Sequence, residues 1–147
     1  MTTTMLGERF VIGNNAEDLR RMSQWLLASG AAADIPQDLI GVLDYCAHEA
    51  VYNIISYAYD DTDRHEIELI LNATANGASL EIRDDGKPFD VLAAPEHKQP
   101  VSLADAKIGG LGIHLIRRLI TRCDYKRENG INVLRLEAQS KRLAGNA

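Results

Sequence analysis

Residues 39–59 constrain the fold more than any other segment, because their apolar residues recur every three or four positions. That spacing lines them up along one side of an α-helix. The recurring apolar positions are Leu39, Val42, Leu43, Cys46, Ala50 and Ile54. Pro36 suits a first helical turn, where its missing N–H costs little, and an acidic run at 60–63 follows. The sequence therefore predicts one long helix from about residue 34 to about residue 59.

Two polar residues, Glu49 and Asn53, lie four positions apart on this helix, so their side chains share one face. The residues around them are apolar enough to bury most of the helix. Removing a carboxylate and a carboxamide from water is costly unless hydrogen bonds or a metal ion compensate. Two interpretations stay open at this point: a solvated polar stripe, or a buried functional pair.

The composition is that of an ordinary globular domain. Of the 147 residues, 46% are hydrophobic and 25% are charged, so the chain can bury a sizeable core. The net charge of −5 argues against a nucleic-acid binder that relies on phosphate contacts. No apolar run approaches the ~20 residues that span a bilayer, and no signal-peptide pattern is visible. We expect a single cytoplasmic domain over residues 1–147, with a disordered tail at 139–147.

Metal and redox motifs are weak. Cys46 and Cys123 are the only cysteines and lie in no Cys/His cluster, so two buried reduced thiols are expected. His48-Glu49 begins an H-E-x-x-H motif, but Tyr52 stands where the second histidine is required. This excludes a zinc-protease motif.

Short alternating segments and turn dipeptides predict an antiparallel sheet with one solvated face. Asn76-Gly77 and Asn129-Gly130 are hairpin turn signals. The predicted strands cover residues 8–13, 65–71, 79–83, 125–127 and 131–138. Asn14 and Asn15 can cap a first helix that Gly30 ends, and a third helix is expected over 109–122.

Asp84-Asp85-Gly86 stands where a predicted strand ends and a long irregular segment, 84–108, begins. It can be a simple turn. Alternatively, Asp84 accepts a hydrogen bond from an exocyclic amine while Gly86 lets a ligand approach the backbone. A loop of ~20 residues in a compact domain is usually functional or disordered.

Gly109-Gly110-Leu111-Gly112 stands at the start of the predicted third helix. It can be a flexible hinge, or a phosphate site formed by unpaired N–H groups. It is not a G-x-G-x-x-G string, and the chain has no G-x-x-x-x-G-K-[ST] loop, so a dinucleotide fold is unsupported.

Taken in order, these motifs resemble those of the GHKL group of ATP-binding proteins, which share the Bergerat fold. Within that group the chain is similar to the anti-sigma factor serine-protein kinases of the RsbW/SpoIIAB type. The segments that carry the resemblance are H-E-A-V-Y-N-I-I-S-Y-A-Y (48–59), R-D-D-G-K-P-F-D (83–90) and G-G-L-G-I-H-L-I-R-R-L (109–119). The resemblance implies an α+β fold: a two-layer α/β sandwich with a mixed, mainly antiparallel sheet and helices on one face.

The same resemblance implies a site for ATP or ADP with Mg²⁺. In this site Glu49 would be the catalytic carboxylate and Asn53 the Mg²⁺ ligand. Asp84 with Gly86 would contact adenine, and Gly110 with Gly112 would contact the phosphates. One asparagine is an adequate anchor, because Mg²⁺ takes few protein ligands and keeps waters and phosphates.

One position departs from the broader group, which often has a second glycine where this chain has Pro88. D-G-K-P-F-D resembles the anti-sigma type instead. Loop motions known from gyrase or histidine kinases are therefore not expected to transfer.

The resemblance implies that the output lies on other proteins, since 147 residues leave no room for a phosphoacceptor helical pair or a transducer domain. The expected partners are a STAS-domain anti-sigma antagonist, phosphorylated on a serine, and a sigma factor that is sequestered. A homodimer is expected, without direct nucleic-acid or membrane contact. The alternatives are a non-catalytic nucleotide-binding module and a free-standing ATP hydrolase.

Overall fold

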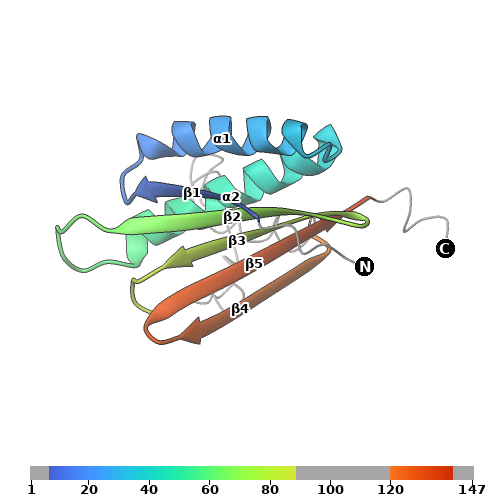
Figure 1. Cartoon of the computed structure of the whole chain (residues 1–147). Helices are drawn as coiled ribbons and strands as arrows, with labels where there is room; N and C mark the ends of the chain where they lie inside the picture. The colour runs from blue at the N-terminus through green and yellow to red at the C-terminus, as the bar shows by residue number, and fades with distance from the viewer. Residues whose placement is uncertain (1–6, 89–119, 141–147) are drawn as a thin grey trace, which may run out of the picture.

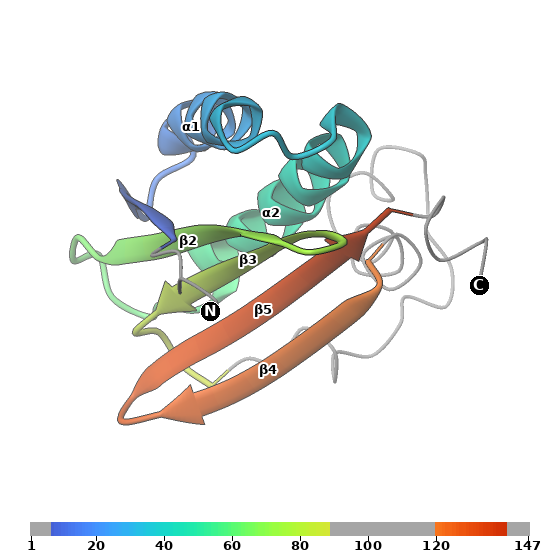
Figure 2. The same cartoon turned by 45° about the vertical axis from the view of Figure 1, so that its right-hand side comes forward.

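The computed structural model describes residues 7–88 and 120–140, and this part of the chain forms two layers. Figures 1 and 2 show a twisted sheet with α1 and α2 on one of its faces. The elements are β1 (Glu8–Gly13), α1 (Asp18–Ala32), α2 (Gln37–Tyr57), β2 (Glu66–Thr74), β3 (Gly77–Asp84), β4 (Arg122–Glu128) and β5 (Ile131–Gln139). The predicted α+β class, with helices on one face of a mainly antiparallel sheet, is confirmed.

The strands are arranged in the order β1-β2-β3-β5-β4, and each described pairing is antiparallel. Both predicted hairpins form. In the second, Asn129 and Gly130 have φ angles of 52° and 79°, as a two-residue turn of the primed type requires. In the first, Thr74 pairs with Gly77, so the turn lies one residue earlier than predicted. The pairing of β3 with β5 is the non-local step that sets Asp84 opposite Asn132.

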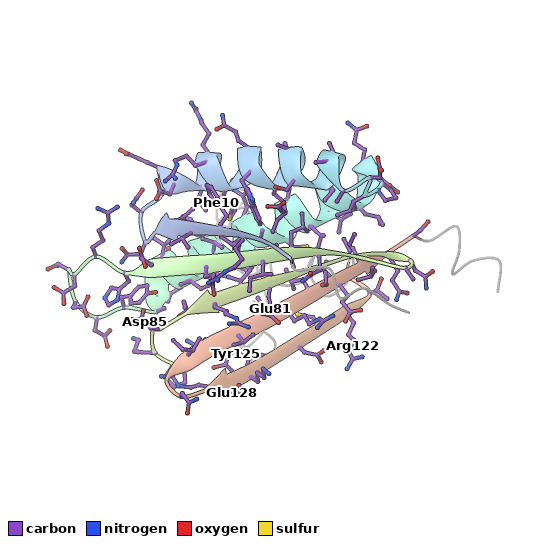
Figure 3. The ribbon with its side chains drawn as sticks, in the orientation of Figure 1. Phe10, Glu81, Asp85, Arg122, Tyr125 and Glu128 are labelled. Carbon is purple, nitrogen blue, oxygen red and sulfur yellow. The ribbon has the colours of Figure 1, made fainter. Side chains whose placement is uncertain are left out.

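The two faces of the sheet differ in polarity. Toward the helices, β2 and β3 present residues that are almost fully buried, namely Ile67, Leu69, Leu71, Leu80 and Ile82. Away from the helices, Glu68 accepts from Arg9, and Arg83 contacts both Glu68 at 3.8 Å and Glu81 at 2.8 Å. Figure 3 labels Glu81 on this charged face. The alternation predicted one solvated face, and this is confirmed.

Helix α1 continues two residues past Gly30, which the sequence wrongly predicts as its end. A Cβ atom at Gly30 would lie 2.4 Å from Cδ1 of Ile40 on α2. Glycine is therefore required here because the two helices approach each other closely, not because the helix ends. At the other end, Asn15 Oδ1 accepts from the Asp18 N–H at 3.0 Å, but the N-cap of α1 is Glu17, whose side chain makes no capping hydrogen bond, so the cap predicted at Asn14 or Asn15 is wrong.

Two predicted boundaries near the C-terminus are also wrong. Arg122 begins β4, so the helix expected over 109–122 cannot extend that far; residues 109–119 lie outside the described part. Gln139 belongs to β5, not to a tail, and its N–H donates to Thr121 Oγ1 at 3.1 Å. Residues 141–147 lie outside the described part. These edges depend on pairing with distant strands, which a local pattern does not reveal.

Both cysteines lie in described elements, Cys46 on α2 and Cys123 on β4. No disulfide joins Cys46 and Cys123. Cys46 is buried and Cys123 half-buried, and burial raises the pKa of Cys46 to about 12. Within residues 7–88 and 120–140, no helix is long and apolar enough to cross a membrane.

Candidate functional site

Asp84 is the last residue of β3 and is 5% exposed, which is unusual for a carboxylate. Its Oδ2 atom accepts a hydrogen bond from the Gly86 N–H at 2.9 Å and another from Asn132 Nδ2 at 3.0 Å. Burial raises the pKa of Asp84, and these two hydrogen bonds and the charge of Arg127 oppose that rise. The carboxylate is thus buried but held by donors, as a ligand-recognising acceptor must be.

Asn132 lies at the centre of a side-chain network beside Asp84. Its Nδ2 donates to Asp84 and also reaches the carbonyl oxygens of Lys87 at 2.9 Å and Gly86 at 3.3 Å. Its Oδ1 accepts from the Tyr125 hydroxyl at 2.5 Å and from Arg127 Nη1 at 2.9 Å. Figure 3 shows Tyr125 on β4, the strand next to β5. Every polar position of this buried amide is therefore used.

The turn after Asp84 is fastened to the end of α2. The Lys87 N–H donates to the Ala58 carbonyl at 2.8 Å, and Lys87 Nζ contacts Asp60 Oδ1 at 2.9 Å. A Cβ atom at Gly86 would lie only 2.5 Å from the Ala58 Cβ and 2.8 Å from its carbonyl oxygen. Gly86 is thus required by the close approach of Ala58, and its predicted role of letting a ligand approach the backbone stays a prediction.

A second contact joins the loop before β2 to the same turn. His65 lies 2.8 Å from Asp61 through Nε2 and 3.3 Å from Asp85 through Nδ1, and it stacks on Tyr59 with ring centroids 4.0 Å apart. The hydrogen bond to Asp61 raises the pKa of His65 most, and Asp85 adds to the effect. Burial and the nearby Asp84 and Asp85 carboxylates raise the pKa of the Tyr59 hydroxyl.

Glu49 and Asn53 both lie on α2, as predicted. Glu49 is half-buried, and burial raises the pKa of its carboxyl group. Asn53 is 2% exposed, and its Nδ2 atom has no hydrogen-bond partner among the described residues. A solvated stripe is therefore wrong for Asn53. A buried amide N–H group left without an acceptor is a donor that an oxygen atom of a ligand can satisfy.

The described part of the chain offers little else to hold a metal ion. No group of three or more His, Cys, Asp or Glu side chains gathers there in ligating positions. Mg²⁺ prefers oxygen ligands and often takes only one or two from protein, the rest coming from phosphates and water. The side-chain oxygen of Asn53 is a ligand of the type that Mg²⁺ prefers.

The fold brings together part of the predicted set. Helix α2 carries Glu49 and Asn53, and its end contacts the turn that holds Asp84 and Gly86. Asn53 precedes Ala58 by five residues, about 7.5 Å along the helix axis. Gly110 and Gly112 lie outside the described residues, so their predicted place at the site stays a prediction.

Sequence reasoning missed Asn132 and the residues that hold it. A hairpin turned at Asn129-Gly130 pairs Arg127 with Asn132, so that contact could have been found from the sequence. The contact with Asp84 could not, because it depends on which strands are neighbours in the sheet.

Comparison with known proteins shows the class of protein to which this sheet topology and site belong. The chain belongs to the histidine kinase-like ATPase domain family, which it matches over residues 12–138. It is 37% identical over 98 residues to the serine/threonine-protein kinase BtrW of Bordetella bronchiseptica, covering 67% of this chain and 69% of BtrW. It is 29% identical over 87 residues to the serine-protein kinase RsbW of Halalkalibacterium halodurans, covering 56% and 52% of the two chains. The predicted kinship with RsbW-type kinases is confirmed.

A solved structure agrees on the fold. The blue-light activated histidine kinase of Erythrobacter litoralis EL346 superposes with a TM-score of 0.53 at 14% identity. The superposition covers 86% of this chain and 42% of that one. At this identity it supports the architecture alone.

Proposed function

We propose that this chain is an ATP-dependent protein-serine kinase and anti-sigma factor of a partner-switching system. The observation that carries the proposal is the buried Asp84, held by Asn132 and Gly86 in a turn fastened to α2. Helix α2 also carries Glu49 and Asn53, whose Nδ2 atom has no hydrogen-bond partner among the described residues. The names of BtrW and RsbW support serine or threonine as the phosphate acceptor.

In this proposal each residue has a separate task. Asp84 accepts a hydrogen bond from the exocyclic amine of adenine, and Gly86, which has no side chain, lets the base approach the backbone beside Asp84. Asn53 provides the side-chain ligand for Mg²⁺, which when bound neutralises charge on the phosphates. Gly110 and Gly112 offer backbone N–H groups to the phosphates.

Glu49 would act on the acceptor serine. Its carboxylate accepts the hydroxyl proton as the serine oxygen bonds to the γ-phosphorus and the bond to the β-phosphate bridging oxygen breaks, leaving ADP. Burial raises the pKa of Glu49, which makes its carboxylate a better proton acceptor than an exposed one.

The partners in this proposal are a STAS-domain antagonist, which receives the phosphate, and a sigma factor, which is sequestered by the unoccupied kinase. Unphosphorylated antagonist would displace sigma, and phosphorylation would release the antagonist. We propose a homodimer in the cytoplasm as the working form.

The test is a transfer assay with radiolabelled ATP, Mg²⁺ and a STAS protein encoded beside this chain. We expect phosphoserine on the STAS protein, and loss of transfer by at least about a hundredfold in Glu49→Gln and Asn53→Ala, the scale of losing a general base or metal anchor. Normal transfer by both variants would show that the site is misassigned. Nucleotide binding without transfer would favour a non-catalytic module, and rapid ATP turnover without a partner would favour a hydrolase.

A further inference from the structure

Asn132 belongs to no motif that predicts a function, yet it makes more side-chain hydrogen bonds than any other described residue around Asp84. It is 3% exposed and lies opposite Asp84 in the register of β3 and β5. A buried polar group of this kind is costly unless it is satisfied, and here both polar atoms of the Asn132 amide have partners.

The direction of the Asn132 amide is fixed by its surroundings. Three acceptors, from Asp84, Gly86 and Lys87, lie on the Nδ2 side. Two donors, Tyr125 and Arg127, lie on the Oδ1 side. Turning the amide over would place its oxygen against the acceptors and its nitrogen against the donors, so a single orientation is stable.

This orientation decides which oxygen of Asp84 is left for a ligand. Both donors to the carboxylate, the Gly86 N–H and Asn132 Nδ2, reach Oδ2. Oδ1 makes no hydrogen bond to another part of residues 7–88 or 120–140. An ionised carboxylate oxygen accepts hydrogen bonds and cannot donate one. Oδ1 of Asp84 therefore favours a purine with an amino group at C6 over one with a carbonyl oxygen there. A carbonyl oxygen facing Oδ1 would leave two acceptors without a donor between them.

We propose that Asn132 is a positioning residue for base selection: it holds Oδ2 of Asp84 so that Oδ1 meets the base, and Tyr125 and Arg127 fix its amide. This inference rests on the proposed function, since it assumes that Asp84 contacts adenine. It goes beyond that function by assigning the preference for a 6-amino purine to a residue on another strand.

The test compares ATP with inosine triphosphate, which carries an oxygen in place of the C6 amino group. Binding of each is measured by calorimetry to the wild type and to Asn132→Leu, which has a similar volume and no hydrogen-bonding group. We expect Asn132→Leu to lower the ATP-to-inosine-triphosphate affinity ratio by about tenfold or more, the scale of losing a hydrogen bond to a charged group. A ratio within about twofold of the wild type would overturn the inference.

Asn132→Asp supplies a second readout, the pH profile of ATP binding. Its carboxylate would face Asp84, and two carboxylates at this distance share one proton. We expect weak ATP binding near pH 8 and substantial recovery near pH 5.5, where the shared proton replaces the amide N–H. Tyr59, Asp85 and Arg127 also face Asp84, but they are present in the wild type too, so the difference between the two pH profiles isolates position 132. Identical profiles would contradict the proposal.

Asn72→Asp is the matched control, because it makes the same change on β2 near the opposite end of the β2–β3 hairpin. It should leave the affinity ratio and its pH profile unchanged, and an equal effect there would refute the assignment to Asn132. Should Asn132→Leu fail to fold, Tyr125→Phe leaves the amide in place and removes one donor to it. We then expect a fall in the ratio of about threefold, and no fall would count against the inference. If the wild type binds neither nucleotide, the proposed function fails first and this inference falls with it.

Discussion

Gly86 gives the sharpest test of how the candidate site is built, because the space for a side chain there can be measured. A Cβ atom at this position would lie 2.5 Å from the Ala58 Cβ, 2.8 Å from the Ala58 carbonyl oxygen and 3.0 Å from Asp84 Oδ2. The backbone of Gly86 is not in the left-handed region, so the destabilisation by alanine would come from these contacts alone. Two of these contacts involve atoms fixed to the backbone at the end of α2, which cannot move aside cheaply.

We therefore expect Gly86→Ala to lower the free energy of unfolding by about 1–3 kcal/mol, the usual cost of overpacking. The matched control is Gly41→Ala on the exposed side of α2, where a new Cβ would meet nothing within 4 Å. There, alanine should stabilise the helix by about 0.5–1 kcal/mol.

Urea denaturation followed by circular dichroism measures both changes. With a slope of about 1–3 kcal/mol per molar urea, a loss of 2 kcal/mol moves the midpoint down by roughly 1 M, while the control moves up. If the free energy of unfolding of Gly86→Ala lies within about 0.5 kcal/mol of the wild-type value, the turn packs less tightly against α2 than described, and the prediction is wrong.

Three further predictions concern stability. Burial raises the pKa of Glu49, so the native state binds its proton more tightly than the unfolded state does. Glu49→Gln should therefore increase the free energy of unfolding at pH 7. Denaturation at several pH values should show that this gain vanishes below about pH 4.5. The hydrogen bond from the Gly13 N–H lowers the pKa of Asp18, so its stabilisation is present above the ordinary value of 3.8 and lost as pH falls through the lower native value. Asp18→Asn should thus be less stable than the wild type at pH 7 and converge with it toward pH 2, and a constant difference would contradict this. Gly30→Ala should cost about 1–3 kcal/mol by crowding Ile40, and an unchanged melting curve would show that the helices can separate.

The amino-acid sequence by itself determined the elements that depend on near neighbours. Helix α2 follows from its three- and four-residue apolar spacing, and the β4–β5 hairpin follows from Asn129-Gly130. Glu49 and Asn53 share a helix face for the same local reason. The order of the motifs along the chain was enough to indicate the family. These features need only the geometry of a helix turn or a two-residue loop.

Tertiary structure decided what depends on segments far apart in the chain. Strand β5 lies next to β3 although 46 residues separate Asp84 from Ile131 in the numbering, and only this pairing sets Asn132 against Asp84. The sequence predicts a helix end at Gly30, because the contact with Ile40 that requires this glycine comes from another helix. Local patterns carry no information on which strand is the neighbour, since the energy of that choice comes from burial across the whole sheet. The glycine at 86 was visible in the sequence, but the side chains that hold its aspartate were not.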